Sequence, residues 1–272
     1  MTDQIRMDRS NPELWIATFD HPPINLIDPD TIEELQALVG ALETDAEVRV
    51  IVFRSTDPDF FLAHWDVLAD KARTAAMKPG PTGMHPWLDF LARLSRAPVV
   101  SIAEIRGIAR GAGSEFVLAC DMRFASLEKA ILGQFEVGVG AVPGGNPMAR
   151  LAGLVGRGRT LEIILAADDW PADLAERYGY VNRALPDRDL ASFVGGLAQR
   201  IAGFEKHALV RAKAHVDAAS LPPDDLFQPA MDDFFRSVAN PASQARTRRL
   251  LQRGLQTRSE IEYALGRAVA DQ

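Results

Sequence analysis

The chain has 272 residues, 47% hydrophobic and 25% charged, with a formal net charge of −7, a composition typical of a globular protein with one large core and an appended segment. The acidic balance, without a basic cluster, argues against a nucleic-acid partner. Because the first residues lack the apolar centre of a signal peptide and no run reaches membrane-spanning length, we expect a cytoplasmic protein with no membrane partner.

Strands and helices are predicted in alternation up to about residue 186. Apolar alternation and β-branched runs favour strands at 14–19, 48–53, 98–105, 122–125 and 178–184, and helical spacing favours helices at 29–43, 87–94 and 156–166. Asp28 is a predicted N-cap, with Pro29 as the first helical residue. Residues 67–85 predict a short helix in a mobile surface excursion, for which a lid is one interpretation.

The stretch Gly107–Asp121 has the features of a ligand site. It joins a strand end, the small turn Gly111-Ala112-Gly113 and a helix with Glu115 in its first turn. Such small residues let a ligand approach free N–H groups at a helix N-terminus, which favours an anion or a carbonyl oxygen becoming one. The alternative is a tight turn in which Glu115 only complements the helix dipole.

Beyond about residue 186 the β-branched runs stop, and the sequence predicts helices. Pro222-Pro223 and Asn240-Pro241 divide this part into three or four helices. Apolar residues such as Met231 and Phe235 need a surface to pack against, so we expect a subunit interface here.

Five segments resemble, in order and spacing, those of the enoyl-CoA hydratase/isomerase (crotonase) superfamily. Apart from Gly107–Asp121, they are Pro22-Pro23-Ile24-Asn25, Phe61-Leu62-Ala63-His64-Trp65-Asp66, Gly133-Gln134-Phe135-Glu136 followed by Pro143-Gly144, and Gly179-Tyr180-Val181-Asn182. Each match is weak alone, and the set is specific. The likeness extends over nearly the whole chain.

The resemblance implies a ClpP/crotonase-like α/β fold, with a spiral core of strand–strand–helix repeats over 1–190 and a helical oligomerisation region over 191–272. It also implies an acyl-CoA thioester as substrate and a homotrimer or dimer of trimers. By position, the backbone N–H groups of Trp65 and Ala112 would hold the thioester oxygen, and Glu115 and Glu136 would be the catalytic acids. Substrate contacts are expected from Pro23, Ile24, Ala63, His64, Asp66, Gly111 and Phe135.

The expected reaction is the addition of water to an enoyl-CoA, or its removal. Two backbone donors would stabilise the charge that develops on the thioester oxygen. Two carboxyl groups would activate the water and protonate the α-carbon, with Glu136 as our hypothesis for the proton donor and Glu115 for the base. No cofactor is expected beyond the coenzyme A of the substrate, because Cys120 is the only cysteine and the histidines outside these segments lack metal-ligand spacing.

Three departures from the family pattern put the substrate in doubt more than the fold. His64-Trp65 replaces small residues, Ala112 replaces the middle glycine of its turn, and 143–148 is less glycine-rich than usual. Isomerase, hydrolase, decarboxylase and C–C lyase reactions on the same fold therefore stay open, as does a non-catalytic acyl-CoA binder. A serine peptidase on a related spiral fold is disfavoured, because no Ser, His and Asp set falls in suitable loops.

Overall fold

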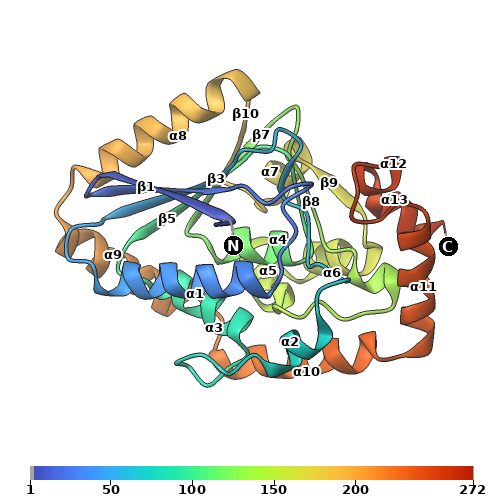
Figure 1. The fold of residues 1–272 in the computed structure, drawn as a ribbon. Helices are drawn as coiled ribbons and strands as arrows, with labels where there is room; N and C mark the ends of the chain where they lie inside the picture. Colours follow the sequence, from blue (N-terminus) through green and yellow to red (C-terminus); the bar gives the residue numbers. More distant parts are fainter. Residues whose placement is uncertain (1–2, 272) are drawn as a thin grey trace.

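The computed structural model describes residues 3–271 and contains two β-sheets (Figure 1). The larger sheet has the order β1 (Ile5–Asn11), β2 (Leu14–Phe19), β3 (Val50–Ser55), β5 (Val100–Ile105), β7 (Met122–Ser126) and β10 (Arg183–Leu185). The smaller has the order β4 (Phe60–Leu62), β6 (Ile108–Arg110), β8 (Ile131–Gly133) and β9 (Asp169–Pro171). Pairing is parallel except between β1 and β2 and between β8 and β9.

The predicted strand–strand–helix repeat is present in three consecutive units. Each unit gives its first strand to the larger sheet, its second strand to the smaller sheet, and then forms a helix. The units are β3–β4 with α3 (Pro86–Arg96), β5–β6 with α4 (Ala112–Ala119), and β7–β8 with the short 3₁₀ helix η1 (Glu136–Val139) and α5 (Pro147–Val155). The repeat places the ends of β4, β6 and β8 side by side.

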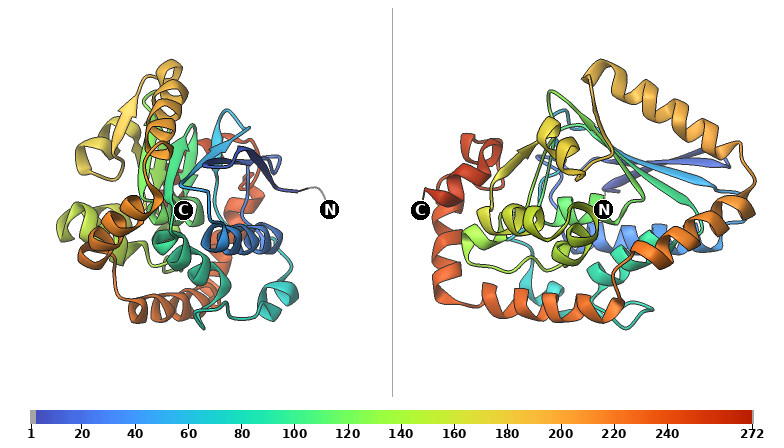
Figure 2. Two further views of the ribbon diagram at one scale, coloured as in Figure 1. Left: turned by 90° about the vertical axis from the view of Figure 1, so that its left-hand side faces the viewer. Right: turned by 180° about the vertical axis from the view of Figure 1, so that it is seen from behind.

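Helices cover both faces of the larger sheet (Figure 2). Side chains alternate along β3, so that Val50 and Val52 face α8 (Asp187–Ala202) while Ile51 and Phe53 face α1 (Pro29–Thr44), α3 and α4. The second face holds an aromatic cluster centred on Phe116 of α4. Its ring lies 4.9 Å from that of Phe53 and 5.8 Å from that of Phe90, between centroids. This packing fixes α4 against the sheet.

The C-terminal helices run around the outside of the core and return to the smaller sheet (Figure 1). They are α9 (Lys206–Ser220), η2 (Asp224–Leu226), α10 (Phe227–Val238), α11 (Pro241–Gln252), α12 (Glu260–Tyr263) and α13 (Leu265–Ala270). Both proline breaks are confirmed, but there are more helices than the three or four expected, because the chain turns again at Gly254 with a φ of 106°. Helix α8 includes residue 190. The division of the chain into a spiral core at 1–190 and a helical oligomerisation region at 191–272 stays a prediction.

Several sequence predictions were wrong in detail. The strand expected at 178–184 is only β10, because Tyr178 ends helix α7 (Ala172–Tyr178) and Gly179 turns the chain with a φ of 85°. Strand β1 was missed because it is a largely exposed edge strand without apolar alternation. Helices α5 and α7 were also missed.

Other predictions agree with the structure. The short helix expected within 67–85 is α2 (Lys71–Ala76), and the helix expected at 156–166 is α6 (Arg157–Ala166). Asp28 caps α1 by accepting a hydrogen bond from the N–H of Thr31. None of the helices within residues 3–271 is both long and apolar enough to cross a membrane.

Substituting Phe116→Ala is expected to lower the free energy of unfolding by about 3–5 kcal/mol, because it opens a cavity among packed aromatic rings. Chemical denaturation followed by fluorescence would measure this. Leu127→Ala is the matched control, since Leu127 is 44% exposed and its loss should change stability by no more than about 0.5 kcal/mol. Equal destabilisation by both variants would contradict a core centred on Phe116.

Candidate active site

Three loops meet at the carboxyl ends of the parallel strands β4, β6 and β8. The N–H of Arg110 donates to the carbonyl of Ala63 at 3.1 Å, and the N–H of Gly111 donates to the carbonyl of Gly133 at 3.0 Å. The loops are 63–66, 111–113 and 134–136. The structure therefore brings together the predicted residues Ala63, His64, Trp65, Asp66, Gly111, Ala112, Phe135 and Glu136.

The predicted segment 22–25 and the two residues after it are joined to the loop after β4 by backbone hydrogen bonds. The N–H of Ala63 donates to the carbonyl of Asn25 at 3.2 Å, and the N–H of Ile27 donates to the carbonyl of His64 at 2.9 Å. Pro23 is exposed on this segment, whereas Ile24 is fully buried in a small apolar cluster with Phe60 and Ile108.

The peptide N–H groups of Trp65 and Ala112 lie at this edge, and neither has an acceptor among the described residues 3–271. In each case the carbonyl of the same peptide unit is already held. The His64 carbonyl accepts from Ile27, and the Gly111 carbonyl accepts from the N–H of Glu115 at 2.9 Å. Because a trans peptide directs its N–H opposite to its carbonyl, both donors are fixed in direction.

Glu115 lies in the first turn of α4, as predicted, and both of its oxygens accept hydrogen bonds. Oε2 accepts from the indole Nε1 of Trp87 at 2.7 Å, and Oε1 accepts from the N–H of Gly145 at 2.7 Å. Burial raises the pKa of Glu115 above its usual value, while these two bonds and the charge of Arg150 favour the ionised form.

Glu136 begins η1 and is only 8% exposed. Its Oε2 has no hydrogen-bond partner among the described residues. Burial, reinforced by the negative charge of Glu115, raises the pKa of Glu136 to about 8. At neutral pH Glu136 is therefore protonated, and the two carboxyl groups differ in environment.

Two glycines make room for the two carboxyl groups. A Cβ at Gly145 would lie 2.2 Å from Oε2 of Glu115, and a Cβ at Gly111 would lie 2.6 Å from Oε1 of Glu136. Gly111 also has a φ of 49°, in the left-handed region that favours glycine. Any larger residue at either position would displace a carboxylate.

Sequence reasoning missed Trp87 and Gly145 as partners of Glu115. The indole N–H of a buried tryptophan needs an acceptor, which was the available signal for Trp87. No feature of the sequence indicates that the backbone N–H of Gly145 binds Glu115. Asp121, in contrast, has a structural role, because its Oδ2 accepts hydrogen bonds from the N–H of Ser101 and from Lys213.

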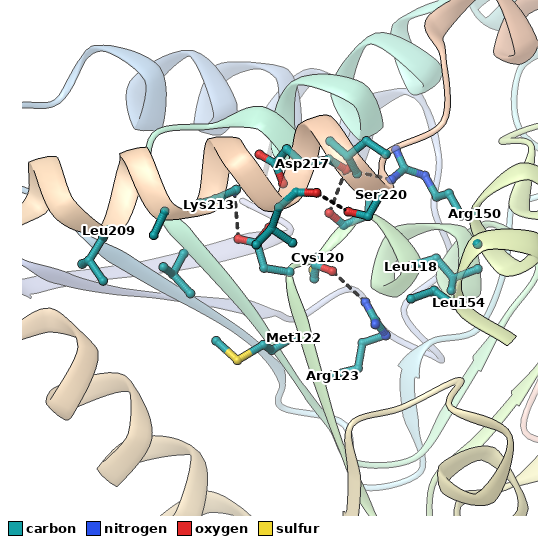
Figure 3. Close-up of a pocket in the computed structure, with 18 of the residues that line it drawn as sticks. Leu118, Cys120, Met122, Arg123, Arg150, Leu154, Leu209, Lys213, Asp217 and Ser220 are labelled. Atoms are coloured by element: carbon teal, nitrogen blue, oxygen red, sulfur yellow. Dashed lines mark hydrogen bonds and ion pairs between the residues drawn. The ribbon is translucent and has the colours of Figure 1, made fainter.

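A cavity of about 550 Å³ lies at the other end of α4, away from Glu115 and Glu136 (Figure 3). Cys120 and Met122 line it, and the ion pair between Lys213 and Asp121 crosses one side at 2.8 Å. Cys120 is a buried free cysteine. Among residues 3–271 no group of three His, Cys, Asp or Glu side chains is placed to hold a metal ion.

Comparisons with known proteins agree on one family. The family model described as "Enoyl-CoA hydratase/isomerase" matches residues 10–245. A short-chain-enoyl-CoA hydratase of Clostridium acetobutylicum is 32% identical over 68% of this chain and 70% of its own length. A crotonyl-CoA hydratase of Syntrophomonas wolfei is 32% identical over 70% of this chain and 72% of its own length.

A solved structure from Streptomyces avermitilis is 44% identical in sequence to this chain. Its description as an enoyl-CoA hydratase is provisional. The alignment covers 99% of this chain and 97% of that one, with a TM-score of 0.94. The predicted superfamily, its fold and its hydratase-type enzyme class are confirmed by these comparisons. The chain belongs to the enoyl-CoA hydratase/isomerase family.

Proposed function

We propose that this protein adds water to the double bond of an enoyl-CoA thioester, and removes it in reverse. The observation that carries the proposal is a pair of buried carboxyl groups with unequal hydrogen bonding, beside two peptide N–H groups without acceptors. Relatives that are named enoyl-CoA hydratases support the same substrate class.

The N–H groups of Trp65 and Ala112 would form the oxyanion hole. Attack of water at the β-carbon moves an electron pair toward the thioester oxygen, which then carries negative charge. Donors that are already oriented stabilise this charge without reorganising, and each contributes roughly 3–4 kcal/mol in comparable sites. The peptide units that carry the N–H groups of Trp65 and Ala112 are held in this way, because their carbonyls already accept hydrogen bonds.

The two glutamates would divide the proton transfers. Glu115, whose hydrogen bonds favour the ionised form, would orient water and accept its proton as the oxygen attacks the β-carbon. Glu136, protonated at neutral pH, would deliver its proton to the α-carbon. A proton passing from Glu115 to Glu136 after product release restores the starting state, and the proposed reaction needs no cofactor beyond the coenzyme A of the substrate.

We further propose a homotrimer or a dimer of trimers, in keeping with the resemblance, and a cytoplasmic location. Helix α9 contains no buried residue. Large apolar side chains are exposed on or next to the C-terminal helices, namely Phe204, Val216, Leu226 and Phe235. Such surface is typically covered by another subunit.

Glu115→Gln and Glu136→Gln should each lower the turnover of short-chain enoyl-CoA by roughly 10²–10⁴-fold, because each removes a proton transfer. The loss of the conjugated-thioester absorbance would measure it. Glu104→Gln is the matched control, since Glu104 is also a buried glutamate but lies on β5 outside the site, and it should keep wild-type turnover. Full activity in either site variant would overturn the roles proposed here.

Hydration should be lost at alkaline pH. Below about 8 Glu136 carries the proton that the α-carbon needs, and above that pH it is ionised. The value of kcat/KM for hydration is therefore expected to fall about tenfold for each further pH unit. A pH profile that rises from 7 to 9 would contradict Glu136 as the proton donor.

Sedimentation at micromolar concentration should show a species of three or six chains, each of 29.7 kDa. Val216→Asp should shift it toward smaller species, because Val216 is 63% exposed on α9 and a charge there would be costly to bury. A wild-type protein that sediments as a monomer would refute the assembly.

A further inference from the structure

A buried histidine next to the proposed oxyanion donor pairs with a carboxylate from the far end of the chain. His64 is 1% exposed and Glu262, on α12, is 0% exposed. The Nε2 atom of His64 lies 3.3 Å from both carboxylate oxygens of Glu262. Its Nδ1 atom lies 2.7 Å from the carbonyl oxygen of Trp65.

The geometry and the electrostatics together favour an ion pair. A carbonyl oxygen can only accept, so Nδ1 of His64 carries a proton. An ionised Glu262 also only accepts, so Nε2 opposite it carries a second proton, and the two groups shift each other's pKa in the directions that favour this imidazolium–carboxylate pair. Burial opposes the charge on His64, but Glu262 and the two hydrogen bonds outweigh it, so the pKa of His64 is raised. Burial likewise opposes the charge on Glu262, yet His64 lowers the pKa of that carboxyl.

The C-terminal segment that carries Glu262 holds the same loop at two more points. The N–H of Val67 donates to Oε1 of Gln256 at 3.0 Å, and Nε2 of Gln256 donates to Asp66. The N–H of Gln256 in turn donates to Oε2 of Glu262 at 2.8 Å. The loop after β4 is therefore bound along its length to residues near the end of the chain.

Other charged groups also face this pair. Arg110 of β6 donates to the carbonyl of Glu262 at 2.7 Å and forms an ion pair with Asp169 of β9 at 2.6 Å. Glu136 of η1 and His64 both lie next to Gly111, on the side to which a Cβ of that residue would point. The arginine positive charge is thus matched by Asp169, which leaves Glu262 as the counter-ion of His64.

We propose that His64 is a positioning residue, and that its ion pair with Glu262 holds the backbone at Trp65 so that the Trp65 N–H keeps the direction that the oxyanion hole requires. This inference rests on the proposed function. The His64 carbonyl, bound by Ile27, fixes the peptide unit that carries the Trp65 N–H, and the imidazolium fixes the next peptide unit by donating to the Trp65 carbonyl. Loss of the Nε2 proton leaves a lone pair facing the carboxylate, so the ring loses the anchor on Glu262 that holds it against the Trp65 carbonyl.

The test compares wild type with Glu262→Gln, which keeps the shape of the side chain but removes the charge. Below pH 7 the variant should show a kcat about tenfold lower, with KM changed by less than about threefold, since a misdirected oxyanion donor weakens the transition state more than the bound substrate. The ratio of wild-type to variant kcat should fall to one or below as His64 loses its proton. Loss of activity through Glu136 affects both proteins and cancels in this ratio.

Tyr263→Phe is the matched control, because Tyr263 is the next residue of α12 and its hydroxyl binds Asp59 instead of the loop after β4. It should leave kcat unchanged. A double variant, His64→Gln with Glu262→Gln, should lose no more activity than the stronger single variant, as expected of two residues that act as one pair.

A second measurement needs neither turnover nor a variant. In wild type labelled with ¹⁵N-histidine, one ring should keep both N–H protons at pH values above about 6.5, the usual pKa of histidine. Its absence would overturn the proposal, as would a kcat ratio that is near one or independent of pH. If wild type hydrates no enoyl-CoA, the proposed function fails and the ¹⁵N spectrum still decides whether the ion pair exists.

Discussion

The parallel pairing of three short strands is the constraint on which the rest of the site depends. Because β4, β6 and β8 run in the same direction, the loops after all three begin at one edge of the smaller sheet. The larger sheet and the aromatic cluster around Phe116 hold α4 in place behind that edge. His64 and Phe135, which follow different strands, thus become neighbours, with ring centroids 5.3 Å apart.

The site holds its carboxyl groups away from water, and this sets their chemistry. Glu115 is stabilised by two donors, whereas Oε2 of Glu136 has none among the described residues. Burial raises the pKa of both acids, but the hydrogen bonds to Glu115 favour its ionised form, whereas the pKa of Glu136 rises to about 8. His64 and Glu262 are also buried, but each lies beside a group of opposite charge that compensates for the loss of water.

Local sequence signals predicted the elements but not all of their partners. The cap at Asp28, the β-branched run before Gly107 and the place of Glu115 in a first helical turn all depend on neighbouring residues, and each is present. The family resemblance, and no local pattern, selected Glu136. The contact between His64 and Glu262 joins positions 198 apart, and no spacing rule covers such a pair. The segment 178–184 has strand-like composition, yet the packing of α7 and the turn at Gly179 decide its conformation.

The return of α12 to the loop after β4 has a consequence for the newly made chain. Synthesis proceeds from the N-terminus, and domains generally begin to fold in that order. Both sheets, α4 and the two glutamates of the proposed site precede residue 186, so the core can begin to assemble before α12 is made. Glu262 and Gln256 follow both sheets in the chain. The loop after β4 therefore gains these partners only after the core around it has been synthesised.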